Sequence, residues 1–482
     1  MTPAFAGPIV PVFTSTVDAP APCAELAAER KWRRRNAYYY AQLHRLFKLH
    51  VPAGARVLEI GCGAGDLLAD LQPSYGVGIE PSRALSHDAQ RRHPRLNIIN
   101  DRYDRFATGE SFDYVVISNA VGHMRDVQRV FERLRGCCHS RTRLVVAYFN
   151  ALWEPALAAA SCIGQRRKTS SGNWLSTDDI VNLLSLTDFQ VVRKSAELLL
   201  PKNVPLLSAA LNRVVAKFWP FNKLALVTFF VARPMGLHDR SMRPKCSVIV
   251  PTHDERGNIA DVVRHTPELG SHTEIIFVDG ASTDGTVQEI ENQIHTNPNR
   301  DIRLVHQGRR GGKGDAVRRG FAAATGDILM ILDADLTVVP DELHKFYDAL
   351  VTGRGELING TRLVYPLEDQ AMRPLNKLAN KMFSLLFSWL LNQRFRDTLC
   401  GTKALWRCQY EVIAANRRYF GEMDPFGDFD LIFGAARADQ KILEIPVRYG
   451  PRRYGNTSIH RFRDGWRLWR MSWVAFRKLK MR

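Results

Sequence analysis

The sequence predicts an α/β protein of two domains, each with a sheet and crossover helices. A chain of 482 residues is too long for one ordinary domain. Strand-like apolar runs alternate with helical patterns in both halves, which is typical of parallel sheets. One charged segment of turn formers (233–245) interrupts the alternation. The expected divisions are an N-terminal extension with a basic helix (1–50), a first domain (51–235), a linker (236–245), a second domain (246–459) and a C-terminal helix (460–482).

The first half opens with a stretch rich in Pro and Ala, followed by a predicted helix over 24–50 that carries a basic cluster. Short apolar runs come next and alternate with amphipathic patterns, so they are interpreted as strands. The predicted strands of this half cover 56–61, 75–80, 96–100, 112–118, 143–149, 189–193 and 224–232.

A glycine-rich loop leads from the first predicted strand into a helical stretch. Gly61, Gly63 and Gly65 would let the backbone approach a ligand closely, with helix amides facing it. Glu80 ends the next strand, where a carboxylate can accept both hydroxyls of a ribose. The spacing G-x-G-x-G differs from that of pyrophosphate binders, and Asp66 would repel a pyrophosphate. The loop therefore indicates a nucleoside ligand without phosphate.

The segment VLEIGCGAG around this loop resembles motif I of class I S-adenosylmethionine-dependent methyltransferases. The likeness continues over roughly residues 51–235 and implies a Rossmann-like fold that binds S-adenosyl-L-methionine. The sulfonium and amino groups of this cofactor suit acids near the loop. The resemblance assigns Glu59 and the loop from Gly61 to Gly65 to the methionine end, Glu80 to the ribose and Asp101 to the neighbourhood of the adenine.

Whether the first domain catalyses methyl transfer depends on the segment SNAVGHMRD (118–126). Gly122 stands where the family often has a glutamate, and His123 is a candidate general base. A histidine at this place is also compatible with a structural position beside the cofactor loop. We interpret the domain as a methyltransferase. The alternative is a module that binds S-adenosylmethionine or a partner without turnover.

In the second half, acidic side chains follow the predicted strands. Glu255 and Asp279 come at the ends of the first two, and Lys313 lies in a glycine-rich loop. Asp333 and Asp335 form a D-x-D pair at the end of the last. Such a pair suits a divalent cation that bridges the diphosphate of a nucleotide sugar. The predicted strands cover 246–251, 274–280, 302–307 and 327–335.

The four motifs P-T-x-x-E, V-D-x-x-S-x-D-G-T, G-K-G-x-A and D-A-D-L resemble glycosyltransferase family 2, which has the GT-A fold, over roughly residues 245–460. Within it, the likeness is closest to the dolichol-phosphate-mannose-synthase-like polyprenyl-phosphate transferases. Gly280, Thr337 and Lys377 depart from the family pattern and leave the donor sugar and the metal coordination open. The resemblance assigns Pro251, His253, Glu255, Asp279, Lys313 and Asp333 to the nucleotide sugar, Asp333 and Asp335 to Mg²⁺ or Mn²⁺, Arg362 to catalysis through phosphate, and Arg373 and Arg452 to the acceptor phosphate.

The acceptor decides whether a catalytic base is needed. A polyprenyl phosphate is already an anionic nucleophile and needs positioning only, whereas a sugar hydroxyl needs a carboxylate to take its proton. Asp424, Asp428 and Asp430 are the candidate bases, with Asp430 preferred, and they are equally compatible with solvated loop and cap positions. Both acceptors stay open.

The net charge of +18 points to a polyanionic partner, and half of it lies near the C-terminus. Residues 452–482 hold ten basic residues and one acid. A helix over 460–482 and a shorter apolar segment, 375–395, are interpreted as membrane-facing, with helices packed on the domain as the alternative. No recognised nucleic-acid module accompanies the charge. The aromatic residues of the tail fall at steps of three or four: Phe462, Trp466, Trp469, Trp473 and Phe476.

The sequence lacks a secretory signal, a spanning apolar run and paired cysteine spacings, so we expect a cytoplasmic enzyme, peripheral on the inner face of an anionic membrane. It would transfer a sugar, by a metal-dependent inverting reaction, from a nucleotide sugar to a polyprenyl phosphate, and methylate a related glycan or lipid-linked sugar. The alternative is transfer to a glycan hydroxyl beside a silent first domain.

Overall fold

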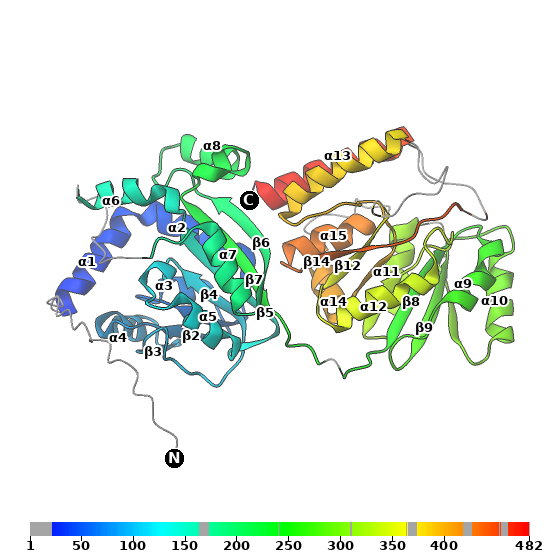
Figure 1. The fold of residues 1–482 in the computed structure, drawn as a ribbon, viewed down its shortest axis with the longest axis horizontal. Coiled ribbons are helices and arrows are strands. Elements are labelled where there is room, and N and C mark those ends of the chain that lie inside the picture. Colours follow the sequence, from blue (N-terminus) through cyan, green and yellow to red (C-terminus); the bar gives the residue numbers. More distant parts are fainter. Residues whose placement is uncertain are drawn as a thin grey trace, which may run out of the picture.

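In the computed structural model, two sheet-centred units lie side by side (Figure 1). Each unit has a seven-stranded sheet with helices packed on it. The residues that the structure describes are 22–162, 173–239, 241–308, 311–362, 364, 374–417, 427–452, 454 and 461–481.

The first sheet has the strand order β3-β2-β1-β4-β5-β7-β6. The first five strands in this order are parallel, as predicted, but β7 runs antiparallel to both β5 and β6. The sheet is therefore mixed, because β7 returns between two parallel strands. Its strands are β1 (Arg56–Ile60), β2 (Tyr75–Ile79), β3 (Asn97–Ile99), β4 (Phe112–Ser118), β5 (Cys138–Phe149), β6 (Phe189–Glu197) and β7 (Val227–Pro234).

The single helix predicted over 24–50 is wrong. The structure has two helices there, α1 (Pro22–Arg35) and α2 (Ala37–His50), because Asn36 leaves the helical region with φ −112° and ψ 28°. One face of α2 is buried against the first sheet. The other helices of this unit are α3 (Asp66–Asp70), α4 (Arg83–Arg92), α5 (Val127–Arg135), α6 (Glu154–Cys162), α7 (Thr177–Leu186) and α8 (Leu207–Arg213).

The second sheet has the order β10-β9-β8-β11-β13-β12-β14 and is also mixed, since β13 runs antiparallel to β11 and β12. The strand predicted over 327–335 ends at Ile331, so the D-x-D pair lies just beyond it. The strands are β8 (Cys246–Thr252), β9 (Thr273–Asp279), β10 (Asp301–His306), β11 (Ile328–Ile331), β12 (Leu357–Thr361), β13 (Lys403–Trp406) and β14 (Ile442–Pro446).

The helices of the second unit cover both faces of its sheet, and the last of them carries the aromatic residues of the tail. They are α9 (Ile259–His265), α10 (Thr286–Thr296), α11 (Lys313–Ala323), α12 (Leu343–Val351), α13 (Pro374–Leu391), α14 (Arg407–Ala415), α15 (Asp428–Arg437) and α16 (Arg461–Ala475).

Buried charges connect the two units. The Nη2 of Arg143, on β5, donates to Oε1 of Glu356 at 2.7 Å, and Nη1 of Arg233 lies 3.9 Å from Oε2 of the same residue. All three side chains are almost fully buried. Arg233 also donates to the carbonyl oxygens of Gly353 and Arg354 at 2.7 and 2.8 Å. Burial would raise the pKa of the Glu356 carboxyl, but the two arginines hold it below its usual value.

A second buried pairing lies beside the first. Asp439 accepts from Nδ1 of His50 at 2.5 Å and from Nη1 of Arg193 at 3.5 Å. Its carbonyl oxygen accepts from Nε of Arg143 at 2.9 Å. The junction is thus held by charge-assisted hydrogen bonds in a water-poor interface.

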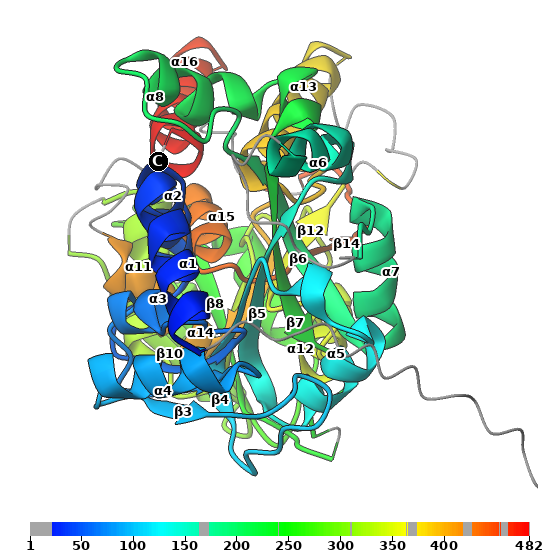
Figure 2. The ribbon, with the colours of Figure 1, turned by 90° about the vertical axis from the view of Figure 1, so that its left-hand side faces the viewer.

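Exposed apolar side chains collect at one end of the molecule, where Figure 2 shows α6, α8, α13 and α16 together. Trp219 is 78% exposed and Trp466 is 73% exposed. The rings of Phe218 and Trp389, one from each unit, lie 5.2 Å apart and join the two parts of this surface. We call it the outer apolar surface; its exposed members are Leu152, Leu206, Leu207, Phe218, Trp219, Phe221, Leu224, Met382, Leu385, Trp466, Trp469 and Trp473.

Helix α16 packs on the second unit through its aliphatic side chains and leaves its tryptophans exposed. The alternative that the helix packs on the domain is confirmed, and the membrane-facing interpretation stays a prediction. Among the residues described, no helix is long and apolar enough to cross a membrane.

We expect Glu356→Gln to lower the free energy of unfolding by about 3–5 kcal/mol, because it leaves Arg143 and Arg233 buried without their counter-charge. Denaturant unfolding followed by circular dichroism measures this loss. Glu411→Gln, an exposed change on α14, serves as the control and should leave stability unchanged. Equal stability of the two variants would contradict a structural role for the buried pair.

Candidate functional sites

The glycine loop of the first unit needs glycine at three places. Gly61, Gly63 and Gly65 have φ values of +79°, +54° and +75°, which other residues rarely adopt. A side chain at Gly61 would also place its Cβ 2.6 Å from Cβ of Ala120. The loop turns tightly between β1 and α3, as its sequence predicts.

Two buried carboxyl groups lie behind this loop. Glu80 accepts hydrogen bonds from the amides of Gly63 and Ser82, both at 2.9 Å, and burial raises its pKa. Glu59 is fully buried within β1, and burial raises its pKa to about 8. Its Oε2 atom has no hydrogen-bond partner among the described residues. A buried carboxyl oxygen without a partner at the base of the loop fits a ligand that brings an ammonium group.

Helix α1 covers the same loop. This contact was not predicted from the sequence. The Nη1 of Arg33 donates to Asp66 at 2.8 Å, and its Nε donates to Glu29 at 3.0 Å. Its Nη2 lies 3.6 Å from where a Cβ at Gly63 would stand. The basic cluster of this helix was visible in the sequence, but nothing local indicates that one of its arginines reaches the loop.

The remaining predicted residues of the first site lie at the ends of neighbouring strands. Asp101 follows β3 and accepts from the amide of Arg102 at 2.7 Å. His123 is exposed on a short turn after β4 (Val121–His123), where the carbonyl of Gly122 accepts from the amide of Asn173. Their assignment to the adenine and to proton transfer stays a prediction.

In the second unit, the D-x-D pair faces two cations. Oδ1 of Asp333 lies 2.5 Å from Nζ of Lys313, and Oδ2 of Asp335 lies 2.9 Å from Nη2 of Arg452. The other nitrogen of that fork, Nη1, contacts Oε1 of Glu255 at 3.0 Å. The structure thus brings together five predicted residues, four from three separate motifs and Arg452 from outside them.

The electrostatics of this cluster are balanced. Burial would raise the pKa of Asp333, but Lys313 outweighs it and holds the pKa below its usual value. The same pairing raises the pKa of Lys313 although burial opposes it. Gly401 allows the close approach, because a Cβ there would lie 2.0 Å from Oδ2 of Asp333. Sequence reasoning missed this glycine, which is far from the motif.

The other predicted contacts to a nucleoside surround the ends of β8 and β9. The carboxylate of Asp279 accepts from the amides of Ala281 and Ser282 at 3.0 and 3.3 Å. Pro251 lies at the end of β8, and His253 follows it with a buried Nδ1 that lacks a partner within the described residues. Asp279 is therefore held in place by backbone donors, and His253 keeps one ring nitrogen available.

The predicted catalytic arginine is firmly paired. Arg362 donates through Nε and Nη2 to Asp397 at 2.7 and 2.8 Å and lies 5.0 Å above the ring of Tyr449. This bidentate pair raises the pKa of the guanidinium against burial. Arg362 is therefore rigid, and its assigned contact with phosphate stays a prediction.

The candidate bases differ in their surroundings. Asp428 accepts from the fully buried Lys403 at 2.8 Å. Asp430 lies 3.8 Å from Arg318 and 3.9 Å from Arg417, and burial raises its pKa. Two residues of the prediction, Arg373 and Asp424, lie outside the described residues.

A metal would need ligands beyond the protein. In the described ranges, no group of three or more His, Cys, Asp or Glu side chains is placed to hold a metal ion. Asp333 and Asp335 supply two carboxylates, which fits a cation such as Mg²⁺ whose other ligands are water and the phosphates of a substrate.

Comparison with known proteins agrees with this division. A family model for glycosyl transferase family 2 matches residues 247–418, and a model for a methyltransferase domain matches residues 31–194. Glycosyltransferase AglD of Haloferax volcanii is 28% identical over 225 residues, which are 45% of this chain and 35% of that protein. Dolichol-phosphate mannosyltransferase of Pyrococcus furiosus is 25% identical over 219 residues, 45% of this chain and 59% of that protein. The chain thus spans less than two thirds of either relative.

Solved structures resemble each half. An S-adenosylmethionine-dependent methyltransferase of Thermotoga maritima has a TM-score of 0.35 at 16% identity, covering 43% of this chain and 95% of its own. Mannosyltransferase PcManGT of Pyrobaculum calidifontis was solved with GDP-Man and Mn²⁺. It has a TM-score of 0.32 at 23% identity, and the match covers 43% of this chain and 56% of that one. The expected α/β folds are confirmed by the two sheets, and the chain carries a region that matches a methyltransferase domain before a region that matches glycosyl transferase family 2.

Proposed function

We propose that the protein transfers a sugar from a nucleotide sugar to a polyprenyl phosphate and methylates a related glycan or lipid-linked sugar. The observation that carries the first reaction is the cluster after β11, where Asp333 and Asp335 face Lys313 and Arg452. Two carboxylates and two cations suit a donor diphosphate together with Mg²⁺ or Mn²⁺. Bound there, the metal would neutralise charge on the departing diphosphate.

A lipid phosphate is favoured over a sugar hydroxyl as the acceptor. Asp428 pairs with Lys403, and Asp430 lies near Arg318 and Arg417. Both carboxylates already have cationic neighbours, which does not favour either as a general base. An anionic phosphate needs no base and is positioned by cations such as Arg452. Relatives named dolichol-phosphate mannosyltransferase support this acceptor class.

The first domain would supply the methyl group from S-adenosyl-L-methionine. The glycine loop, the buried Glu59 with one unpartnered oxygen and the strand-end Glu80 support binding of this cationic cofactor. One chain that holds both domains supports a shared product, in which the transferred sugar or its lipid-linked form accepts the methyl group.

Attachment to an anionic membrane is supported by the outer apolar surface. Its exposed tryptophans and leucines come from both domains. The segments that carry most of it (198–224, 375–396 and 465–482) contain no Asp or Glu and several Lys and Arg. Exposed aromatic and basic side chains together suit the interface of an anionic bilayer.

We expect Asp335→Asn to reduce sugar transfer at least about 100-fold, because several kcal/mol of charge stabilisation by the metal would be lost. Labelled sugar that enters an organic phase with polyprenyl phosphate measures this. Asp341→Asn, an exposed change eight residues after Asp333, is the control. Near wild-type transfer by Asp335→Asn would refute the metal assignment, and dependence on Asp430 would favour a hydroxyl acceptor.

The affinity for S-adenosylmethionine should rise about tenfold per pH unit from pH 6 toward pH 8. Glu59 has a pKa of about 8 when the cofactor is absent, and the cofactor's ammonium favours the ionised carboxylate. Binding below pH 8 therefore releases a proton from Glu59. Calorimetry across this pH range measures both effects.

Glu59→Gln should weaken binding and abolish the pH slope, whereas Glu132→Gln, an exposed change on α5, should keep both. A wild-type affinity that does not change with pH would contradict the role of Glu59. Binding without methyl transfer to any sugar-containing acceptor would support the silent module instead.

We expect the protein to float with vesicles of anionic phosphatidylglycerol and much less with neutral phosphatidylcholine. Changing Trp466, Trp469 and Trp473 together to Ser should reduce this binding at least about tenfold, because each loses interfacial apolar contact. Their exposure makes the fold tolerant of the change. The matched control replaces three exposed apolar residues elsewhere, Leu186, Met242 and Val412. Equal flotation of the two triple variants would exclude this surface.

A further inference from the structure

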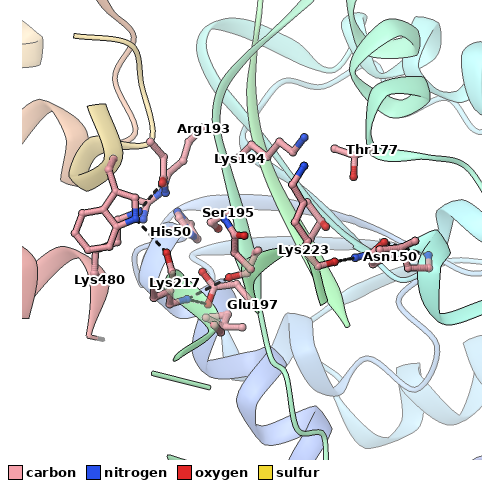
Figure 3. Close-up of a pocket in the computed structure, with 18 of the residues that line it drawn as sticks. His50, Asn150, Thr177, Arg193, Lys194, Ser195, Glu197, Lys217, Lys223 and Lys480 are labelled. Atoms are coloured by element: carbon pink, nitrogen blue, oxygen red, sulfur yellow. Dashed lines mark hydrogen bonds and ion pairs between the residues drawn. The ribbon is translucent and has the colours of Figure 1, made fainter. Parts of the chain in front are cut away.

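A pocket of about 730 Å³ lies at the junction of the two domains, apart from both predicted sites. Its walls come from the edge strand β6 and helix α2 of the first domain and from α13 and the C-terminal turn of the second. None of the residues assigned above to cofactor, donor or acceptor lines it. Figure 3 shows the side chains that point into it.

Three cations converge on one side of the pocket (Figure 3). Arg193 and Lys217 come from the first domain, and Lys480 comes from the turn after α16. Arg193 is 8% exposed, and its Nε has no hydrogen-bond partner in the part of the chain that the structure describes. Lys480 is 6% exposed; it donates to Oδ1 of Asn392 and lies 5.1 Å from the ring centroid of Trp389.

Two carboxylates near these cations are already in ion pairs. Glu197 is paired with Lys217, and these two groups together contribute no net charge. Asp439 contacts Arg193 and His50 at the junction. Within the described residues, Lys480 has no carboxylate at ion-pair distance. The pocket lining as a whole carries five Lys and Arg side chains against two carboxylates, Asp178 and Glu197, and so has an excess of positive charge.

The neighbouring cations affect the pKa of Lys480. Burial lowers its pKa, Arg193 and Lys217 lower it further by repulsion, and Glu197 raises it only in part, so that it lies at about 7. The same cations hold the pKa of Glu197 below its usual value against burial. An anion beside Lys480 would relieve both the burial and the repulsion.

We propose that the pocket binds a phosphate group through Arg193, Lys217 and Lys480. A tetrahedral dianion accepts hydrogen bonds from guanidinium and ammonium groups, and Arg193 has one N–H, at Nε, that lacks a partner among the described residues. Because the donors come from both domains, the bound phosphate would stabilise their contact. This site is separate from the proposed sugar and methyl transfers and does not depend on either.

The surroundings of the pocket favour a phosphate carried by a lipid. Leu152 lines the pocket and is exposed, and Lys217 and Lys223 of the lining flank Phe218, Trp219, Phe221 and Leu224 of the outer apolar surface. Free phosphate has the same group and would use the same three cations. The two sources therefore differ only in the apolar contacts around the pocket.

Calorimetry at pH 8 tests the site with two probes, inorganic phosphate and vesicles that contain phosphatidic acid. Lys480 is mostly neutral at this pH, so binding should take up nearly one proton as its pKa rises. Titrations in buffers of different ionisation enthalpy measure that proton. Tighter binding of these vesicles than of phosphatidylglycerol vesicles of equal charge assigns a lipid source, and binding of inorganic phosphate alone assigns a free one.

Two substitutions separate the proposed role from a structural one. Lys480→Met should weaken phosphate binding at least about tenfold and abolish proton uptake. Lys480→Arg should keep binding without proton uptake, since arginine stays charged. Arg477→Met, an exposed change on the same turn, is the control and should behave as wild type. Failure of the wild type to bind either probe, or equal proton uptake by Lys480→Arg, would overturn the proposal.

Discussion

The arrangement of the molecule depends on one buried carboxylate, Glu356, which faces Arg143 and Arg233 of the other domain. Loss of one partner while the interface stays closed would leave a buried charge uncompensated and cost several kcal/mol, so these three groups fix how the domains meet. The backbone carbonyls that Arg233 also reaches fix its orientation. The junction pocket and the outer apolar surface both include residues of two domains, and each exists only because this pairing sets the domains in one position.

The two candidate sites use opposite electrostatic arrangements. In the first domain, Glu59 has been buried without a counter-charge, which suits a ligand that brings positive charge. In the second, Asp333 and Asp335 are already balanced by Lys313 and Arg452. A donor with phosphates and a metal ion would bring both signs of charge at once and could exchange these pairings without a net cost. The charge of the ligand that each site suits distinguishes the two sites more clearly than their folds do, since both folds are mixed sheets flanked by helices.

Local patterns in the sequence predicted most of the fold. Every strand expected from an apolar run is present, and the carboxylates that follow strands lie where they were expected, because both features depend on neighbouring residues. The direction of β7 and the break at Asn36 were not predicted, since tertiary packing decides them. Pairings such as Arg452 with Glu255 and Asp335 join residues 197 and 117 positions apart, and no local pattern encodes them. For the same reason Arg33, Gly401 and Lys480 could not be linked to any site from the sequence.

Strand β6 ends the first sheet, and its side chains line the junction pocket together with residues of the second domain. The unpaired edge of a sheet is a template on which another chain can form a strand. Here the second domain and its C-terminal turn stand beside that edge. The second domain therefore covers part of this edge, and a first domain isolated at residue 235 would leave β6 open to pairing with a strand of another chain.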